Sequence, residues 1–444
     1  MGVIKYLYII LFFPLFTLSY SNVELVLVKD VSCPQYNLKN PVDSSDVFSF
    51  LRKKKKIQKT YRVGLLLPFC VDSNQSVLNI NIDSIININP HQNNLSFYKK
   101  SQVSIDFYLG FLMSLQKFEN YNIELFLFDI KEDHMSKEVL NDIINSQYLN
   151  NMDFIVGPLF SSNFKYFADN FNSDIPIISP LSKKDYIIND NDNTFQIQSN
   201  VNNYFSLFSE YIFRSHRKDN ILLVRRDTIF ETIKNINEDG PEYIIDTIIP
   251  IDIDYSDLLL EDVDTSFFNF REIKVANNII DSIHHELDTL GMKNIIVIGS
   301  EDNVFVTDLL SKLHACRDTG MVVYGLPAVS KFDHLSIFDL MDMQFTFPDN
   351  KFHSDSLSTQ FVIDFYNYYN YVPRKQYAAV GYEVGLYFFN ILLKHGSIFP
   401  YVASQDPQRV LETIYHFKKI KNGGYKNQGV ILLRFDDFRY KRIH

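Results

Sequence analysis

The sequence predicts an α/β protein of two Rossmann-like lobes, each a mostly parallel sheet flanked by helices. Short unbroken apolar runs, helix-period segments after most of them, and a second series of the same build later in the chain all indicate this class. Strands buried on both faces give unbroken apolar runs, and helices packed on a parallel sheet produce such burial. A chain of 444 residues also exceeds what one compact core usually holds.

The first series begins at Tyr61 and alternates strands with helices. The expected strands are 61–67, 125–128, 154–156 and 175–178, and the expected helices are about 105–115, 135–144 and 161–171. This alternation is typical of a doubly wound sheet with right-handed crossovers.

The second series begins near Phe195 and repeats the rhythm. It predicts helices at 204–213, 229–236, 275–290 and one ending near Cys316, strands at 221–224, 244–249, 295–298 and 321–325, and an acidic loop at 252–264. Ligands bind beyond the carboxyl ends of strands in such sheets, so a cleft between the two lobes is the expected site.

The amino terminus predicts export to the periplasm or cell envelope. Lys5 precedes an apolar stretch at 6–18 that ends in small residues, as in a signal peptide over 1–21. A membrane anchor is the alternative, but the stretch is shorter than the roughly 20 residues of a spanning helix and Pro14 interrupts it. Residues 22–60, with a basic run at 52–56, are expected to form a tether.

Charge and cysteine usage exclude several classes of protein. The net charge of −10 repels phosphate backbones, so we expect no nucleic-acid partner. Cys33, Cys70 and Cys316 are too far apart for a zinc ribbon or a disulfide-dense fold. A Cys33–Cys70 bridge and three unpaired thiols both remain open.

The sequence predicts no catalytic residues, no metal site and no cofactor. It lacks a Gly-x-Ser-x-Gly elbow, a His-Glu-x-x-His helix, a phosphate loop and a Gly-x-Gly-x-x-Gly turn. The tightest cluster of metal-type ligands is His284-His285-Glu286, and adjacent helical residues do not share a face.

The order and spacing of four segments carry a family resemblance, namely Gly157–Ser162, Ile175–Ser182, Phe195–Tyr211 and Phe361–Leu393. Together they resemble type I periplasmic binding proteins of the leucine/isoleucine/valine-binding group, over residues 61–444. The resemblance implies a first lobe of 61–197 with 348–427, a second lobe of 198–347 with a C-terminal strand in 428–444, and a three-segment hinge. The arrangement of residues 61–444 is also similar to the domain of LysM-associated envelope proteins of Bacteroidetes, although residues 22–60 hold no recognisable LysM module.

The resemblance further implies a ligand carboxylate held by hydroxyl and backbone N–H groups after the third and fourth strands. The residues at these places are Ser161, Ser162, Ser179, Ser182 and Lys183. Lys183 stands where the family commonly has a hydroxyl residue, and strengthened anion binding and a side chain in solvent both remain open for it. Ser161 or Ser162 would cap the helix that follows, whose amino-terminal N–H groups and dipole favour an anion. For the serines, helix capping and turn formation are the alternative.

The second lobe is expected to supply an aromatic and an acidic contact. Phe230 occupies the family's aromatic position, with a core helix residue as the alternative reading. The family's acidic partner for the ligand ammonium has no counterpart near Pro327, and Glu301 or Asp302 is the expected substitute.

Two functions remain open on these grounds. One is a secreted, non-enzymatic solute-binding protein that closes over a small polar ligand, such as an amino acid or short peptide, and docks on a membrane permease. The other is an envelope scaffold or regulator with a degenerate pocket, whose partner is a cell-wall enzyme or membrane protein.

Overall fold

Two units of the chain, called lobe 1 and lobe 2 below, are evident in the computed structural model. The structure describes residues 23–28, 59–74, 98–131, 134–226, 230–235, 243–248, 256–261, 263–275, 280–316, 320–332, 335–352 and 356–444. Lobe 1 is Met1–Gln198 with Asp355–Gly429, and lobe 2 is Ser199–Ser354 with Val430–His444. The chain therefore passes from lobe to lobe three times. The expected signal peptide, the basic run and Cys33 lie outside the described residues.

The sheet of lobe 1 has eight described strands in the order β1-β3-β2-β4-β5-β6-β17-β16. They are β1 Val23–Val28, β2 Thr60–Leu67, β3 Asn122–Asp129, β4 Phe154–Val156, β5 Ile177–Ser179, β6 Thr194–Gln196, β16 Phe417–Lys419 and β17 Tyr425–Asn427. All neighbours are parallel except β16 and β17. Strand β1 was not predicted: it lies within the span expected to be a tether, and it pairs with β3.

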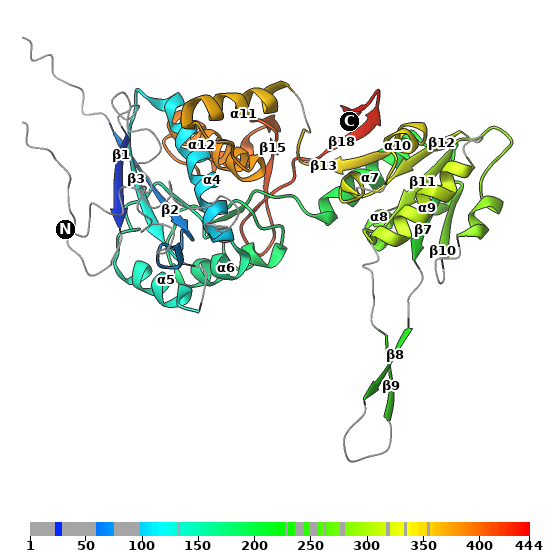
Figure 1. Ribbon diagram of the computed structural model, residues 1–444, viewed down its shortest axis with the longest axis horizontal. Coiled ribbons are helices and arrows are strands. Elements are labelled where there is room, and N and C mark those ends of the chain that lie inside the picture. Colours follow the sequence, from blue (N-terminus) through cyan, green and yellow to red (C-terminus); the bar gives the residue numbers. More distant parts are fainter. Residues whose placement is uncertain are drawn as a thin grey trace, which may run out of the picture. The chain divides into compact units, whose positions relative to one another are not determined.

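Helices cover both faces of this sheet (Figure 1). One face carries α4 Lys99–Leu115, α11 Ser356–Tyr369 and α12 Lys375–His395, and the other carries α5 Ser136–Asn145 and α6 Ser161–Asn170. Successive strand residues alternate between the two cores, so Ile177 packs toward α5 and α6 while Ile178 packs toward α4 and α12. This two-sided burial explains the unbroken apolar runs in the sequence.

Helices α4 and α12 are in backbone contact at two glycines. A Cβ atom on Gly110 would lie 1.9 Å from the carbonyl oxygen of Ala378, and one on Gly381 would lie 2.0 Å from that of Phe107. Any side chain larger than hydrogen would force the helices apart, because backbone atoms cannot rotate away.

Asp106 is a fully buried residue of α4 that binds the loop before α12. Its carboxylate accepts hydrogen bonds from the Tyr371 hydroxyl at 2.9 Å and from the Arg374 backbone N–H at 3.3 Å. Burial is the largest influence on this group and raises the pKa of Asp106 above its ordinary value of 3.8.

This raised pKa predicts a pH-dependent contribution to stability. The folded state holds the Asp106 proton more tightly than the unfolded state, so the free energy of unfolding should fall as the pH rises from about 4 through the folded pKa. Urea unfolding of Asp106→Asn over this range should lack that fall, with Asp364→Asn as a control for net charge. Parallel pH profiles for wild type and Asp106→Asn would contradict the assignment.

The sheet of lobe 2 has seven described strands in the order β10-β7-β11-β12-β13-β18-β19. They are β7 Asn220–Arg226, β10 Phe270–Val275, β11 Asn294–Ile298, β12 Met321–Tyr324, β13 Thr346–Asp349, β18 Ile431–Asp436 and β19 Arg439–Arg442. The first five in spatial order are parallel, and β18 and β19 are antiparallel additions. The helices are α7 Val201–Ser215, α8 Ser256–Leu260, α9 Asn303–Ala315 and α10 Ile337–Asp342. Both lobes thus confirm the predicted fold class.

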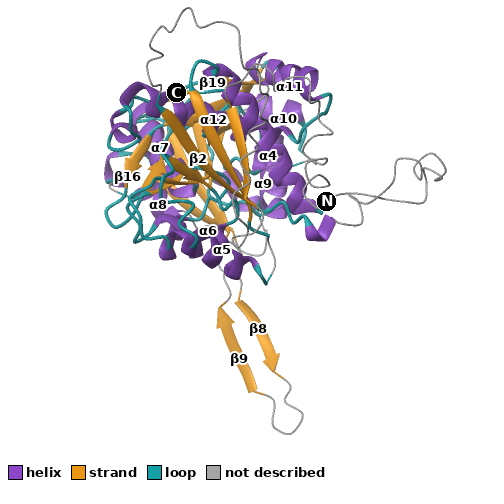
Figure 2. Cartoon of the chain, turned by 90° about the vertical axis from the view of Figure 1, so that its left-hand side faces the viewer, coloured by secondary structure: helices purple, strands orange, loops and turns teal. Residues whose placement is uncertain are grey.

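Two of the predicted helices in lobe 2 are wrong. Residues 230–248 contain strands β8 Phe230–Asn235 and β9 Tyr243–Ile248, which pair antiparallel in a sheet of their own (Figure 2). The predicted helix at 275–290 is replaced by the end of β10 and by a short 3-10 helix, Asp281–His285. In addition, the expected acidic loop contains α8.

Candidate functional site

The carboxyl ends of β4 and β5 in lobe 1 bring two predicted serines together. These strands are parallel neighbours, with Val156 opposite Ile178, so the loops that follow them leave the same edge of the sheet. The hydroxyl oxygens of Ser161 and Ser182 lie 2.8 Å apart, within hydrogen-bond distance. Ser161 is half-buried and Ser182 is buried.

A glycine shapes the first of these loops. Gly157 has a φ of +92°, in the left-handed region, and a Cβ atom there would lie 2.3 Å from the carbonyl oxygen of Leu66. Only glycine fits this turn, which leads the chain from β4 into α6.

Ser182 is held in place by further hydrogen bonds. Its hydroxyl accepts the backbone N–H of Lys184 at 3.2 Å, and its carbonyl oxygen accepts the side-chain amide of Gln196 at 3.2 Å. Gln196 lies on β6 directly opposite Ser179 of β5. The serine loop and the ends of two strands therefore form one polar cluster.

Two atoms of this cluster are buried without a partner. The Ser179 hydroxyl and the Oε1 atom of Gln196 have no hydrogen bond to any residue that the structure describes, and both side chains belong to fully buried residues. Because Ser179 and Gln196 are register partners, their side chains leave the sheet on the same face. Buried polar atoms are normally hydrogen-bonded, so this pair marks a place for a further polar group.

The N-terminus of α6 adds backbone donors to the same edge. Its N-cap is Phe160, which makes no side-chain cap hydrogen bond, so the alternative in which Ser161 caps this helix is wrong. The first N–H groups of a helix have no intrahelical partner and attract anions. Ser162, in the same turn, and Lys183, in the loop after β5, are both exposed.

The carboxyl edge of the lobe 2 sheet is acidic. Glu301 follows β11 and is exposed, and Asp349 ends β13. Burial first, and then the charges of Asp349 and Glu301, raise the pKa of the Tyr204 phenol, so both carboxylates lie within electrostatic reach of that phenol. Tyr204 and Asp349 were not predicted as site residues, although an acid two positions after the apolar Phe347 was a usable signal.

The alternative acid, Asp302, has a structural role. Its carboxylate caps α9 by accepting the Phe305 N–H at 2.7 Å, and it pairs with Arg226 at 3.3 Å. The structure thus gives Asp302 a capping and ion-pair role, while a role of Glu301 against a ligand stays a prediction.

The structure does not place Phe230 in a helix. Phe230 begins β8, with its backbone opposite Ile248, so the interpretation as a core helix residue is wrong. Its role against a ligand stays a prediction.

Comparison with known proteins identifies the fold. No protein-family model and no curated protein matches the chain. A solved structure described as a branched-chain amino acid ABC transporter from Rhodospirillum rubrum is similar over 87% of this chain and 100% of its own, with 12% identity and a TM-score of 0.53. Full-length LpoA from Haemophilus influenzae is similar over 87% of this chain and 59% of its own, with 11% identity and a TM-score of 0.50.

The fold is that of a type I periplasmic binding protein. At such identities the likeness concerns the fold, and this confirms the resemblance inferred from the sequence. Within the described part of this type I periplasmic binding fold, no group of three or more His, Cys, Asp or Glu residues is arranged to hold a metal ion. None of the described helices is long and apolar enough to cross a membrane.

Proposed function

We propose that the protein is an exported, non-enzymatic solute-binding protein that holds a small polar ligand, such as an amino acid or short peptide, by an anionic group. The ligand carboxylate would bind in lobe 1 at the ends of β4 and β5. The observation that supports this most is the fully buried, unpartnered Ser179 hydroxyl in the cluster that contains the Ser161–Ser182 pair.

The chemistry of this cluster suits a carboxylate. Serine hydroxyls rotate freely and donate hydrogen bonds, and hydrogen bonds to a charged group are worth about 1.5–3 kcal/mol each. The uncapped N–H groups of α6 and the exposed side chain of Lys183 add donors and positive charge.

The carboxyl edge of lobe 2 carries acidic side chains, a chemistry that suits a ligand ammonium. Glu301 and Asp349, whose charges both act on the Tyr204 phenol, supply carboxylates at this edge. Closure of the lobes over the ligand and docking on the permease of an ABC transporter stay predictions.

The test is a thermal-shift screen of the mature protein with amino acids, dipeptides and muropeptides. A ligand at a hundred times its Kd should stabilise the protein by about 2.7 kcal/mol. The double variant Ser161→Ala with Ser182→Ala should bind at least about tenfold more weakly, because two hydrogen bonds to a charged group are lost.

The matched control is Ser173→Ala, which removes a hydroxyl at the opposite end of β5. Its Oγ accepts the Ile175 N–H and belongs to the turn before the strand. Equal affinity in the double variant and the wild type would show that the ligand binds elsewhere.

A second candidate is an envelope scaffold or regulator with a degenerate pocket, related to LysM-associated peptidoglycan proteins. The β8–β9 sheet favours it, since both outer edges lack a partner strand among the described residues and can accept a strand from another protein. Replacing residues 230–248 by a Gly-Ser linker should then abolish co-purification of a partner and leave the urea unfolding of the two lobes unchanged. A partner that still co-purifies would exclude the β8–β9 edges as its site.

A further inference from the structure

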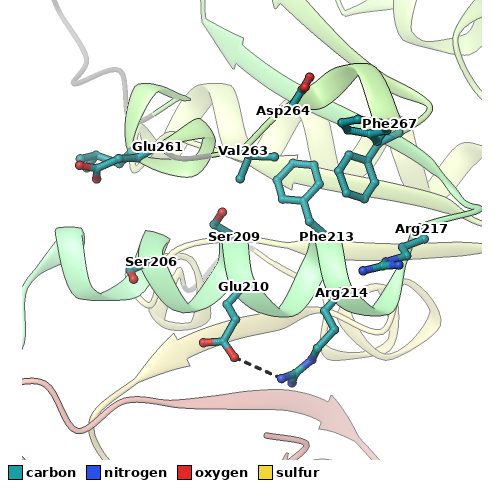
Figure 3. A pocket seen from close by; sticks show the side chains of 12 residues that line it. Ser206, Ser209, Glu210, Phe213, Arg214, Arg217, Glu261, Val263, Asp264 and Phe267 are labelled. Carbon is teal, nitrogen blue, oxygen red and sulfur yellow. Dashed lines mark hydrogen bonds and ion pairs between the residues drawn. The ribbon is translucent and has the colours of Figure 1, made fainter.

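Lobe 2 contains a pocket of about 810 Å³ that holds none of the predicted site residues (Figure 3). One wall is α7, and the other is the segment from α8 to Phe268. The lining residues are Ser206, Ser209, Glu210, Phe213, Arg214, Arg217, Leu258, Glu261, Val263, Asp264, Phe267 and Phe268. This volume is within the usual range of small-ligand sites, about 300–1,000 Å³, and too small for a whole protein domain.

The middle of the pocket is apolar. Phe213 is buried in its wall, and Val263 lies across from it (Figure 3). Phe267, at the rim, is 79% exposed. A ligand that covers the exposed ring of Phe267 gains the free energy of removing apolar surface from water.

Only two of the charged side chains in the pocket are free to bind. Glu210 and Arg214 form an ion pair at 3.1 Å. The carboxylate of Asp264 accepts the Ser266 N–H at 3.0 Å and the Ser266 hydroxyl at 2.6 Å. Glu261 and Arg217 have no ion-pair partner in the described ranges and lie toward opposite ends of the pocket (Figure 3).

The length of the pocket sets the size of the ligand. The lining residues on α7 run from Ser206 to Arg214, and these eight helical steps of about 1.5 Å each span about 12 Å. An extended peptide advances about 3.3 Å per residue, so about four residues fill this length.

We propose that the pocket along α7 binds a short free peptide of about four residues, with a basic group at Glu261, an acidic group at Arg217 and apolar side chains over Phe213 and Phe267. This site is separate from the serine cluster of lobe 1 and does not depend on the function proposed for that cluster.

The experiment compares three blocked peptides by isothermal titration calorimetry. They are acetyl-Lys-Leu-Leu-Glu-amide, acetyl-Lys-Leu-Leu-Lys-amide and acetyl-Glu-Leu-Leu-Glu-amide. The mixed peptide should bind about fivefold more tightly than either like-charged peptide, the effect of one exposed ion pair. Arg217→Glu makes both ends acidic and should transfer the preference to the dilysine peptide.

The neighbouring Lys218 provides a matched control, since it is exposed, carries the same charge and does not line the pocket. Lys218→Glu should keep the preference for the mixed peptide. Phe267→Ser should lower the affinity for all three peptides equally, by about tenfold. The proposal is overturned if no peptide binds, if Arg217→Glu keeps the wild-type preference, or if Lys218→Glu loses it.

Discussion

Gly381→Ala should destabilise lobe 1 by about 3 kcal/mol, the upper range of overpacking in a protein core. The new methyl group would lie 2.0 Å from the carbonyl oxygen of Phe107 and 3.0 Å from the backbone nitrogen of Phe111. Both atoms belong to the backbone of α4, so the clash is relieved only if α4 and α12 separate.

The sign of this effect is informative because helix propensity acts in the opposite direction. Alanine is favoured over glycine inside a helix by about 1 kcal/mol. Urea unfolding should therefore give a lower free energy of unfolding for Gly381→Ala, although helix propensity alone predicts a higher one. Gly299→Ala is the control, since a Cβ atom there meets nothing within 4 Å. A Gly381→Ala protein as stable as the wild type would mean that the helices are not in backbone contact.

Glu383→Ala should cost lobe 1 about 3–5 kcal/mol, as expected when the charged partner of a buried network is removed. Glu383 is fully buried on α12. Its carboxylate accepts the backbone N–H groups of Glu412 at 2.6 Å and Thr413 at 2.7 Å, and the Thr413 hydroxyl at 2.7 Å. Alanine would leave these donors buried without an acceptor.

Glu383→Gln is the matched variant, because it keeps the shape and one acceptor oxygen. Its loss of stability should be about half that of alanine, the difference between a neutral and a charge-assisted hydrogen bond. Chemical denaturation of both variants measures this order. Equal losses would show that packing volume, and not the carboxylate, determines the effect.

The sequence predicted the buried strands well because burial on both faces leaves little doubt about an apolar run such as Ile295–Ile298. It failed at residues 229–236, where Phe230, Ile233 and Ile236 recur at helical spacing. The missed signal was Asp239-Gly240, a pair typical of β-hairpin turns, between runs rich in β-branched residues. The strand β10 was also not predicted. It lies at the edge of the sheet and is only partly buried, so its sequence lacks an unbroken apolar run.

The sequence predicted only part of the candidate site. The family resemblance indicated Ser161 and Ser182, and their hydroxyls meet because the carboxyl ends of parallel strands lie at one edge of the sheet. Gln196 was not indicated, since its contribution depends on its register opposite Ser179. The pocket along α7 could not be predicted either, because its second wall comes from a stretch that was expected to be a loop.

The position of β18 in the chain constrains the order in which the lobes mature on the ribosome. β13 gains its antiparallel neighbour β18 only after residues 355–429, the return segment of lobe 1, have been synthesised. Throughout that interval the outer edge of β13 presents unpaired N–H and C=O groups, the kind of edge that promotes aggregation. Lobe 2 is therefore completed last. A chaperone would be most useful during the interval in which the edge of β13 is unpaired.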